Sequence, residues 1–359
     1  MLLRLSPKPR FIATVCHYLF TKPPPPSPPK LRCCSTLPNF TTETQTLTKP
    51  ALKSLILAYY HHNKFHNLLQ NVVASPSVLL TACSGLKNHE NPDTTTPNSP
   101  ESLPLSLGSV STQFFSLQEL SLQLCENRFD INSCCVPILP PTHKGKPLVL
   151  PNLKLKVVIE AIRIVLEVIY DDRFVTFSYG GRINVGRHTA IRYLKNSVEN
   201  PSWWFSVRFD HELFGNRHVD KLCLILEEKI EDKTLIDFIK RLFESEAVKI
   251  ELGGSYLARG LPQGCRLSSI LINIYLNGFD KKIQELRLKT NKENPKVEEN
   301  ELVSRASISG SVFYKPLKIY AVRYLDEILI ITSGTKMLTM DLKSSVSQVF
   351  GGGHGVEGG

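Results

Sequence analysis

The feature that most constrains the fold is the stretch Lys318–Thr332, in which two apolar runs flank a short polar turn. This pattern is typical of a β-hairpin, because β-branched side chains favour strands and a short turn reverses the chain. The turn, Tyr324-Leu325-Asp326-Glu327, carries two adjacent carboxylates. Adjacent acids repel, so a site that keeps both ionised needs a cation, and oxygen ligands suit Mg²⁺. The competing interpretation is a solvated turn, since Asp is a common turn residue.

A third carboxylate follows another apolar strand. The stretch Trp203–Asp210 is mostly aromatic and apolar and ends in the acid. An acid at the end of a strand that faces a carboxylate-bearing hairpin is one way to assemble a two-metal site. Asp210, Asp326 and Glu327 are therefore the candidate Mg²⁺ ligands.

Length and composition argue for a globular core and against a membrane-spanning helix or a zinc ribbon. A length of 359 residues allows a large core and two or three domains. No uninterrupted apolar run approaches the roughly 18 residues of a membrane-spanning helix, so we expect no membrane partner. The nine cysteines include no C-x-x-C pair, which argues against a zinc ribbon.

The N-terminal stretch is basic. Residues 1–42 hold six Lys and Arg and no acid, so they carry six of the ten net positive charges and leave +4 for residues 43–359. An acid-free stretch with basic and hydroxyl side chains is typical of an organellar transit peptide. The alternative is a disordered tail, because Pro23–Pro29 is proline apart from Ser27. The Arg and Lys content favours the mitochondrion over the chloroplast.

Basic side chains near glycines form a candidate RNA-binding set. The stretch Phe177–His188 combines glycines, aromatics and cations, and glycine lets a backbone approach a phosphate closely. A second basic turn precedes the edge strand expected at Leu148–Pro151. The predicted RNA-binding residues are Arg182, Arg187, His188, Lys144 and Lys146.

Helical spacing dominates several other stretches. Apolar residues recur at helical positions in residues 51–87 and in Val157–Tyr170. Further helices are expected at 117–124, 219–229 and 233–243. The block Gly260-Leu261-Pro262-Gln263-Gly264 opens an apolar helix that carries polar Ser268, Ser269 and Asn273. Taken alone, this block also fits a buried core helix with a capped start.

Three blocks now stand in a fixed order: the strand that ends at Asp210, the Gly260–Gly264 block and the Tyr324–Glu327 turn. In this order they resemble the reverse-transcriptase domain of group II intron-encoded proteins, and more closely the nuclear-encoded organellar maturases of plants. The Gly-x-Pro-Gln-Gly block, with the apolar helix after it, is the most specific match. The resemblance covers residues 50–335, with a divergent gap at 88–115.

The resemblance implies an α+β right-hand polymerase fold with fingers, a palm and a helical N-terminal extension. In that family, the positions of the three acids named above bind catalytic Mg²⁺. Tyr324 would lie beneath the incoming nucleotide, and Gln263 and Gly264 would line the primer and nucleotide channel. Group II intron RNA, within organellar pre-mRNA, is the implied partner, and other splicing factors are further candidates.

The chain departs from the family at several points. Active members carry Tyr-Ala-Asp-Asp, whereas Leu325 and Glu327 replace the small residue and the second aspartate here. Glu adds one methylene to a site that needs sub-ångström placement. Gly181 stands where the family usually has an aromatic residue. We also expect the thumb and the maturase domain to be absent, because a glycine-rich stretch follows Phe350.

These observations predict five parts: a transit peptide at 1–42, a helical extension at 43–87, a low-complexity loop at 88–115, a fingers and palm domain at 116–345 and a disordered tail at 346–359. Three interpretations of function remain. The leading one is an RNA-binding splicing cofactor for group II introns that uses a degenerate polymerase scaffold. The others are an active RNA-directed DNA polymerase with two Mg²⁺ ions and a non-functional fragment.

Overall fold

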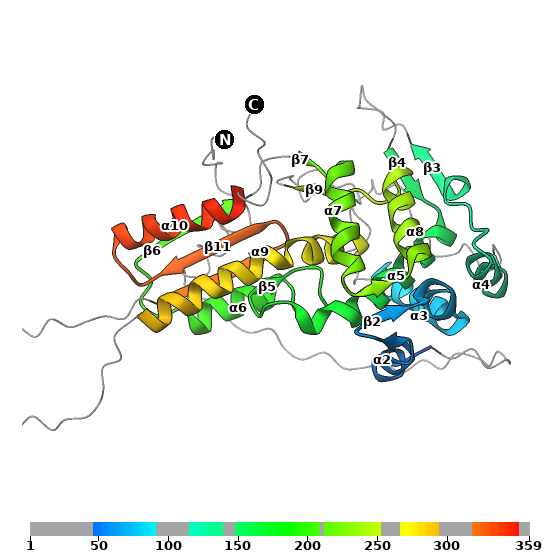
Figure 1. Cartoon of the computed structure of the whole chain (residues 1–359), viewed down its shortest axis with the longest axis horizontal. Helices are drawn as coiled ribbons and strands as arrows, with labels where there is room; N and C mark the ends of the chain where they lie inside the picture. The colour runs from blue at the N-terminus through cyan, green and yellow to red at the C-terminus, as the bar shows by residue number, and fades with distance from the viewer. Residues whose placement is uncertain are drawn as a thin grey trace, which may run out of the picture.

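A sheet and a helical body occupy opposite ends of an elongated molecule (Figure 1). The computed structural model describes residues 46–90, 115–138, 148–208, 212–252, 266–293 and 318–351. Helices and strands are both present along the chain, so the expected α+β class is confirmed. No helix within these ranges is long and apolar enough to cross a membrane.

The helical body is built around α5 (Leu153–Tyr170). Thirteen of its 18 residues are buried, as expected of a helix that is apolar on nearly every side. Asn152 caps its start, because the Asn152 side chain accepts a hydrogen bond from the Leu155 backbone N–H at 3.0 Å. The surrounding helices are α2 (Lys49–Leu57), α3 (Pro76–Glu90), α4 (Leu117–Cys125), α7 (Asn216–Glu227) and α8 (Lys233–Glu244).

Part of the N-terminal extension differs from the sequence prediction. Residues 51–87 were expected to be helical, but a small hairpin interrupts them, formed by β1 (Tyr60–His61) and β2 (Lys64–His66). Its two-residue turn places His62 at φ +50° and Asn63 at φ +65°, the left-handed geometry that tight hairpins favour. Strand β2 also pairs in parallel with β8 (Ile230–Glu231). Because this partner lies far away in the sequence, local spacing of apolar residues could not reveal the strand. A short π-helix, Leu69–Val73, follows.

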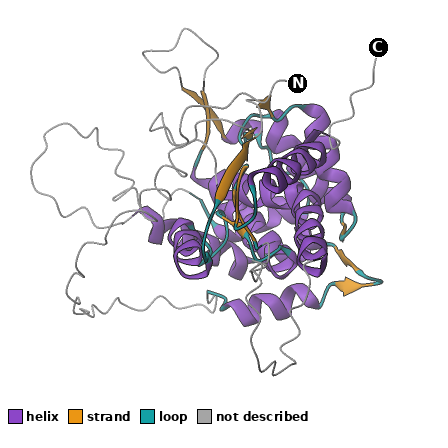
Figure 2. Cartoon of the chain, turned by 90° about the vertical axis from the view of Figure 1, so that its left-hand side faces the viewer, coloured by secondary structure: helices purple, strands orange, loops and turns teal. Residues whose placement is uncertain are grey.

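The sheet contains the expected hairpin. Strands β10 (Ile319–Tyr324) and β11 (Glu327–Thr332) pair antiparallel, with Tyr324 opposite Glu327. The outer strands complete the order β5-β10-β11-β6, where β5 is Ser178–Tyr179 and β6 is Trp203–Arg208. The predicted hairpin is therefore confirmed as the centre of a four-stranded sheet, which Figure 2 views from the sheet end of the molecule.

Helices cover both faces of this sheet. Side chains alternate between the faces along each strand, so Arg323 and Thr332 point to the same side. Arg323 reaches α9 (Arg266–Glu293), and Thr332 hydrogen-bonds Thr339 of α10 (Lys336–Gly351) at 2.8 Å. Tyr324 points to the other side, where α6 (Arg187–Ser197) lies against β10 and β5.

Helix α9 joins the two ends of the molecule. It has 28 residues, and at 1.5 Å per residue it spans about 42 Å. Its first half, from Leu267 to Leu276, packs into the core of the helical body. Ile283 in its second half belongs to the core beneath the sheet.

The remaining elements are short. Strand β4 (Leu148–Pro151) confirms the expected edge strand and pairs antiparallel with β3 (Cys135–Ile138). Strands β7 (Glu212–Leu213) and β9 (Glu251–Leu252) form another pair. Two 3₁₀ turns lie at Asn132–Cys134 and Asp171–Arg173.

Two helices extend past boundaries that the sequence suggested, and the division into domains stays a prediction. The extension 43–87 shares one core with α5, because Ile56 and Val78 are buried in the same cluster. Helix α3 continues to Glu90, past the start of the loop predicted at 88. Helix α10 continues to Gly351 and fully buries Val346, so the tail predicted from 346 begins inside a helix. The transit peptide at 1–42 lies outside the described residues and stays a prediction.

Asp232 connects the extension to α8. Its Oδ1 accepts a hydrogen bond from the Leu235 backbone N–H at 3.0 Å and thereby caps the helix. Its Oδ2 accepts from the Leu69 backbone N–H at 2.8 Å, and the residue is buried. One carboxylate therefore satisfies donors from segments more than 160 residues apart in the sequence.

We predict that Asp232→Ala lowers the free energy of unfolding by about 2–4 kcal/mol, since a lost cap costs about 1 kcal/mol and an orphaned buried N–H about 1–3 kcal/mol. Asp232→Asn keeps one acceptor oxygen, so its free energy of unfolding should fall by less than that of the alanine variant. Urea unfolding followed by circular dichroism measures both variants. Equal stability of wild type and the alanine variant would contradict this role for Asp232.

Candidate functional site

The acidic turn is tight and buried. Leu325 adopts φ +56° between the paired residues Tyr324 and Glu327. A left-handed conformation costs a residue with a Cβ about 1–2 kcal/mol, so surrounding contacts must hold the turn. Asp326 and Glu327 are only 6% and 8% exposed. Both predicted carboxylates are therefore buried at the turn of the central hairpin.

Arg323 contacts this turn directly. Its Nη1 donates to the Leu325 carbonyl oxygen inside the turn. Its Nε and Nη2 each lie 2.6 Å from one oxygen of the Asp280 carboxylate on α9, which makes a bidentate ion pair. Arg323 is 1% exposed and Asp280 is fully buried. Paired charges of this kind are stable in a core only when their hydrogen bonds are satisfied, as they are here.

Asn273 extends the network to the glycine-rich loop. Its Oδ1 accepts from Nη1 of Arg323 at 3.0 Å, and its Nδ2 donates to the Gly180 carbonyl oxygen at 2.8 Å. Nη2 of Arg323 also donates to Ser178 Oγ in β5, at 2.5 Å. A single guanidinium thus fixes the turn, α9 and the start of the loop relative to one another.

Two of the three glycines of this loop lie in positions that a side chain would disturb. Gly180 has φ +85°, and a Cβ on it would lie 3.1 Å from the Tyr324 ring and 3.3 Å from Leu325 Cγ. Gly181 has φ +66°, and a Cβ there would lie 2.4 Å from the Cβ of Ser269. The aromatic residue that the family usually has at position 181 would therefore collide with α9 in this chain.

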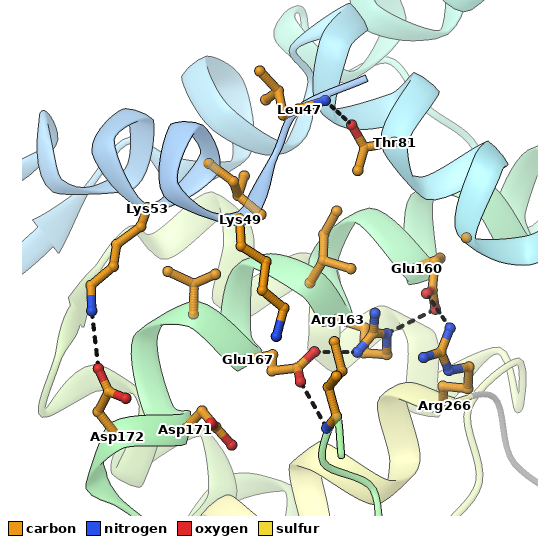
Figure 3. A pocket seen from close by; sticks show the side chains of 15 residues that line it. Leu47, Lys49, Lys53, Thr81, Glu160, Arg163, Glu167, Asp171, Asp172 and Arg266 are labelled. Atoms are coloured by element: carbon orange, nitrogen blue, oxygen red, sulfur yellow. Dashed lines mark hydrogen bonds and ion pairs between the residues drawn. The ribbon is translucent and has the colours of Figure 1, made fainter. Parts of the chain in front are cut away.

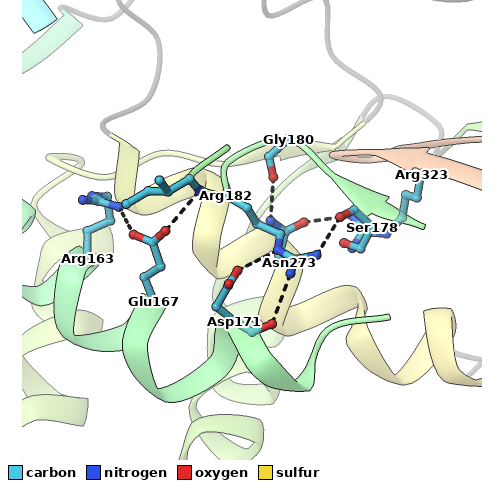
Figure 4. Close-up of polar contacts among 9 residues, drawn as sticks. Arg163, Glu167, Asp171, Ser178, Gly180, Arg182, Asn273 and Arg323 are labelled. Carbon is cyan, nitrogen blue, oxygen red and sulfur yellow. Dashed lines mark hydrogen bonds and ion pairs between the residues drawn. The ribbon is translucent and has the colours of Figure 1, made fainter. Parts of the chain in front are cut away.

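Arg182 makes its contacts inside the protein. Its Nε donates to Asp171 Oδ1 at 2.7 Å, and its Nη1 donates to the Ser178 carbonyl oxygen at 2.9 Å (Figure 4). The guanidinium also lies 5.3 Å from the centre of the Phe174 ring, and the side chain is 10% exposed. This arrangement anchors the loop to the end of α5. Direct binding of RNA by Arg182 stays a prediction.

Arg187 and His188 begin α6 next to the turn. The guanidinium of Arg187 lies 5.9 Å from the centre of the Tyr324 ring, within range of a cation–π contact. His188 is exposed. The structure therefore places one predicted RNA-binding residue against the acidic hairpin and the next on the open surface of the helix.

A buried charge network lies on the other side of the loop, at the base of a pocket of about 380 Å³ (Figure 3). Arg163 of α5 bridges Glu160 at 2.9 Å and Glu167 at 2.5 Å, and all three side chains are under 10% exposed. Glu160 also accepts a hydrogen bond, at 2.7 Å, from Arg266, which is the first residue of α9. Glu167 accepts from the Ile183 backbone N–H at 3.1 Å. The acids of α5 thus hold both the loop and the start of α9.

Burial shifts the pKa of Arg266, one member of this network. Desolvation lowers the pKa of the Arg266 guanidinium, while the neighbouring Glu160 carboxylate acts in the opposite direction. An arginine remains protonated at physiological pH despite such a shift. The pair therefore stays ionic.

Other predicted site residues lie outside the described ranges: Asp210, Gln263, Gly264, Lys144 and Lys146. The register still locates the end of β6, because Arg208, two residues before Asp210, pairs with Glu327. Two buried carboxylates at one corner are a donor set that suits Mg²⁺. Among the residues that the structure describes, no group of three potential ligands forms a metal site.

Sequence reasoning missed Arg323 and Asp280. The signal was present, because each is a charged residue between apolar positions of a strand or helix, where an unpaired charge would be costly. Glu160, Arg163 and Glu167 were missed in the same way on the apolar helix α5. Arg323 and Asp280 lie 43 residues apart, too far for sequence spacing to connect them.

Comparison with known proteins identifies the family. The family model described as reverse transcriptase (RNA-dependent DNA polymerase) matches residues 144–350. The chain belongs to the reverse transcriptase family. The predicted resemblance to group II intron maturases is confirmed as well.

Two similar proteins come from Arabidopsis thaliana. Nuclear intron maturase 3, mitochondrial, is 52% identical over 86% of this chain and 41% of its own length. Nuclear intron maturase 4, mitochondrial, is 31% identical over 82% of this chain and 37% of its own length. The group II intron-encoded protein LtrA of Lactococcus lactis is 31% identical over 43% of this chain and 25% of its length. The chain thus spans less than half of these relatives, and the two plant names agree with the predicted mitochondrial location.

We predict that Arg323→Met lowers the free energy of unfolding by about 3–5 kcal/mol, because it leaves the Asp280 charge buried without its partner. The double variant Arg323→Met/Asp280→Leu removes both charges and should recover part of this loss. Urea unfolding of the three proteins measures the difference. A double variant no more stable than Arg323→Met would show that the unpaired Asp280 charge is not the cause.

Proposed function

We propose that this chain is an RNA-binding splicing cofactor for group II introns in mitochondria, built on a degenerate reverse-transcriptase domain. The observation that carries the proposal is its 52% identity, over 86% of the chain, to a protein named as a mitochondrial nuclear intron maturase. Because the chain spans 41% of that relative, the proposal concerns the part of a maturase that contacts RNA through this domain.

The two ends of the molecule are proposed to correspond to the parts of a polymerase hand. The four-stranded sheet with its acidic hairpin would be the palm. The helical body around α5, with the glycine-rich loop held by Glu167 and Arg182, would form the fingers and the N-terminal extension. In this assignment α9 runs from the fingers into the palm and sets their relative positions.

The acidic turn supports a scaffold role more than a catalytic one. The Leu325 side chain lies beside Gly180, and its bulk replaces the small residue of active members. Glu327 carries its carboxylate one methylene further from the backbone than aspartate does, and misplaced catalytic groups lose orders of magnitude in rate. We therefore propose that RNA-directed DNA polymerisation is not the main activity of this chain.

We also propose that Mg²⁺ can bind at the acidic turn of the hairpin. Asp326 and Glu327, with Asp210, are the residues that would hold it. When bound in a polymerase, the metal activates the primer hydroxyl and stabilises the leaving pyrophosphate. In a splicing cofactor, the chain's own carboxylates would instead serve to keep the turn in place next to Arg187 and Tyr324.

The proposal is tested by RNA binding. We predict that the chain binds a group II intron RNA more tightly than a shuffled RNA of equal length and composition. Since residues 43–359 carry only +4, the affinity should be modest and should fall steeply with salt. Filter-binding titrations at several salt concentrations measure both quantities, and equal affinity for the two RNAs would contradict the proposal.

A further inference from the structure

Helix α6 has two very different faces. One face packs onto the sheet, where Ala190 and Leu194 are fully or almost fully buried. The other face exposes His188, Arg192 and Lys195 at helical spacing, so the three side chains form one stripe. The helix sequence, RHTAIRYLKNS, contains no acidic residue. We name these three residues the α6 stripe.

The stripe differs from an ordinary solvated surface, where both signs of charge alternate. In the part of the chain that the structure describes, no residue of the stripe forms an ion pair. Some other exposed lysines are paired, for example Lys240 with Asp220 at 2.9 Å. The first acid after α6, Glu199, lies 2.5 Å from Lys318, and this lysine lowers the pKa of the Glu199 carboxyl. Glu199 is thus engaged by Lys318 and, within the described residues, forms no ion pair with the stripe.

The stripe continues from the acidic hairpin. Arg187, directly before it, places its guanidinium over the Tyr324 ring. Its Nε is shielded from solvent and donates to no atom within the described ranges. From His188 the stripe runs along α6 for seven residues, about 10 Å at 1.5 Å per residue. Positive charge therefore extends in a line away from the turn.

We propose that the α6 stripe binds the sugar–phosphate backbone of the intron RNA, an inference that rests on the proposed function. Arg and Lys side chains in a row match the repeating charge of a phosphate chain and read no bases. An anionic membrane is the less suitable partner, because surface-binding helices insert an apolar face and the apolar face of α6 is already buried against the sheet.

The test uses the full chain with the substitutions Arg192→Gln and Lys195→Gln together. Gln is a good helix former, so α6 should remain folded, which circular dichroism and urea unfolding can verify. The matched control is Lys281→Gln/Lys282→Gln, which removes two exposed charges from α9. Both proteins are titrated with a group II intron RNA across a range of salt concentrations.

We expect the α6 variant to bind the intron RNA roughly tenfold more weakly at 0.1 M salt and to lose about one to two units of salt slope, because about one counterion is released per phosphate contact. The α9 control should keep the affinity and slope of the wild type within twofold. Preference for intron over shuffled RNA should persist in the α6 variant, since backbone contacts carry no sequence information.

The other outcomes each overturn the inference. If the wild type prefers intron RNA but the α6 variant keeps its affinity and slope, α6 is not the contact and the proposed function stands. If both variants weaken equally, the effect is net charge rather than a site. If the α6 variant loses only sedimentation with anionic phospholipid vesicles, the partner is a membrane. If the wild type shows no preference for intron RNA, the proposed function fails and the inference fails with it.

Discussion

The buried ion pair between Arg323 and Asp280 is the interaction on which the rest of the structure depends. It joins the central hairpin to α9, and α9 alone runs through both cores of the described structure. The same guanidinium reaches the turn at Leu325 and, through Asn273, the loop at Gly180. A side chain that makes this many charge-assisted contacts in a dry interior fixes geometry, because any displacement leaves a buried charge unsatisfied. The strained turn, the tight glycine loop and the direction of α9 therefore form one unit.

Local sequence patterns predicted the helices and strands whose formation depends mainly on their own residues. The hairpin, α5, α7 and α8 follow from β-branched alternation or helical spacing, and the structure confirms them. The β1–β2 hairpin was missed because its stability comes from β8, a strand far along the chain. The role of Arg182 could not be predicted either. A basic residue beside glycines suggests RNA, and only the fold shows that Asp171 and Ser178 hold its guanidinium.

Polar residues in apolar elements were the most informative signal that sequence reasoning left unused. Asn273 was noted in an otherwise apolar helix, but its partners, Arg323 and Gly180, come from segments on either side of it in the sequence. On α5, Glu160 and Glu167 likewise contact distant segments, at Arg266 and at the Ile183 backbone N–H. In both networks the polar groups position loops. The chain thus keeps the α+β framework of its reverse-transcriptase family. Leu325 and Glu327 occupy the turn of the central hairpin, and the cations of the α6 stripe lie on the helix that begins beside it.

We propose that this chain supports splicing of group II introns in mitochondria. The most direct measurement is the ratio of spliced to unspliced transcript for every mitochondrial group II intron, in cells that lack the chain and in cells where it is restored. The account predicts that a defined subset of introns accumulates unspliced RNA without the chain. Restoring the wild type, or a variant with Asp326→Asn, should recover splicing. Unchanged ratios for all introns after removal of the chain would contradict the account, and recovery by the wild type but not by Asp326→Asn would contradict the non-catalytic role of the turn.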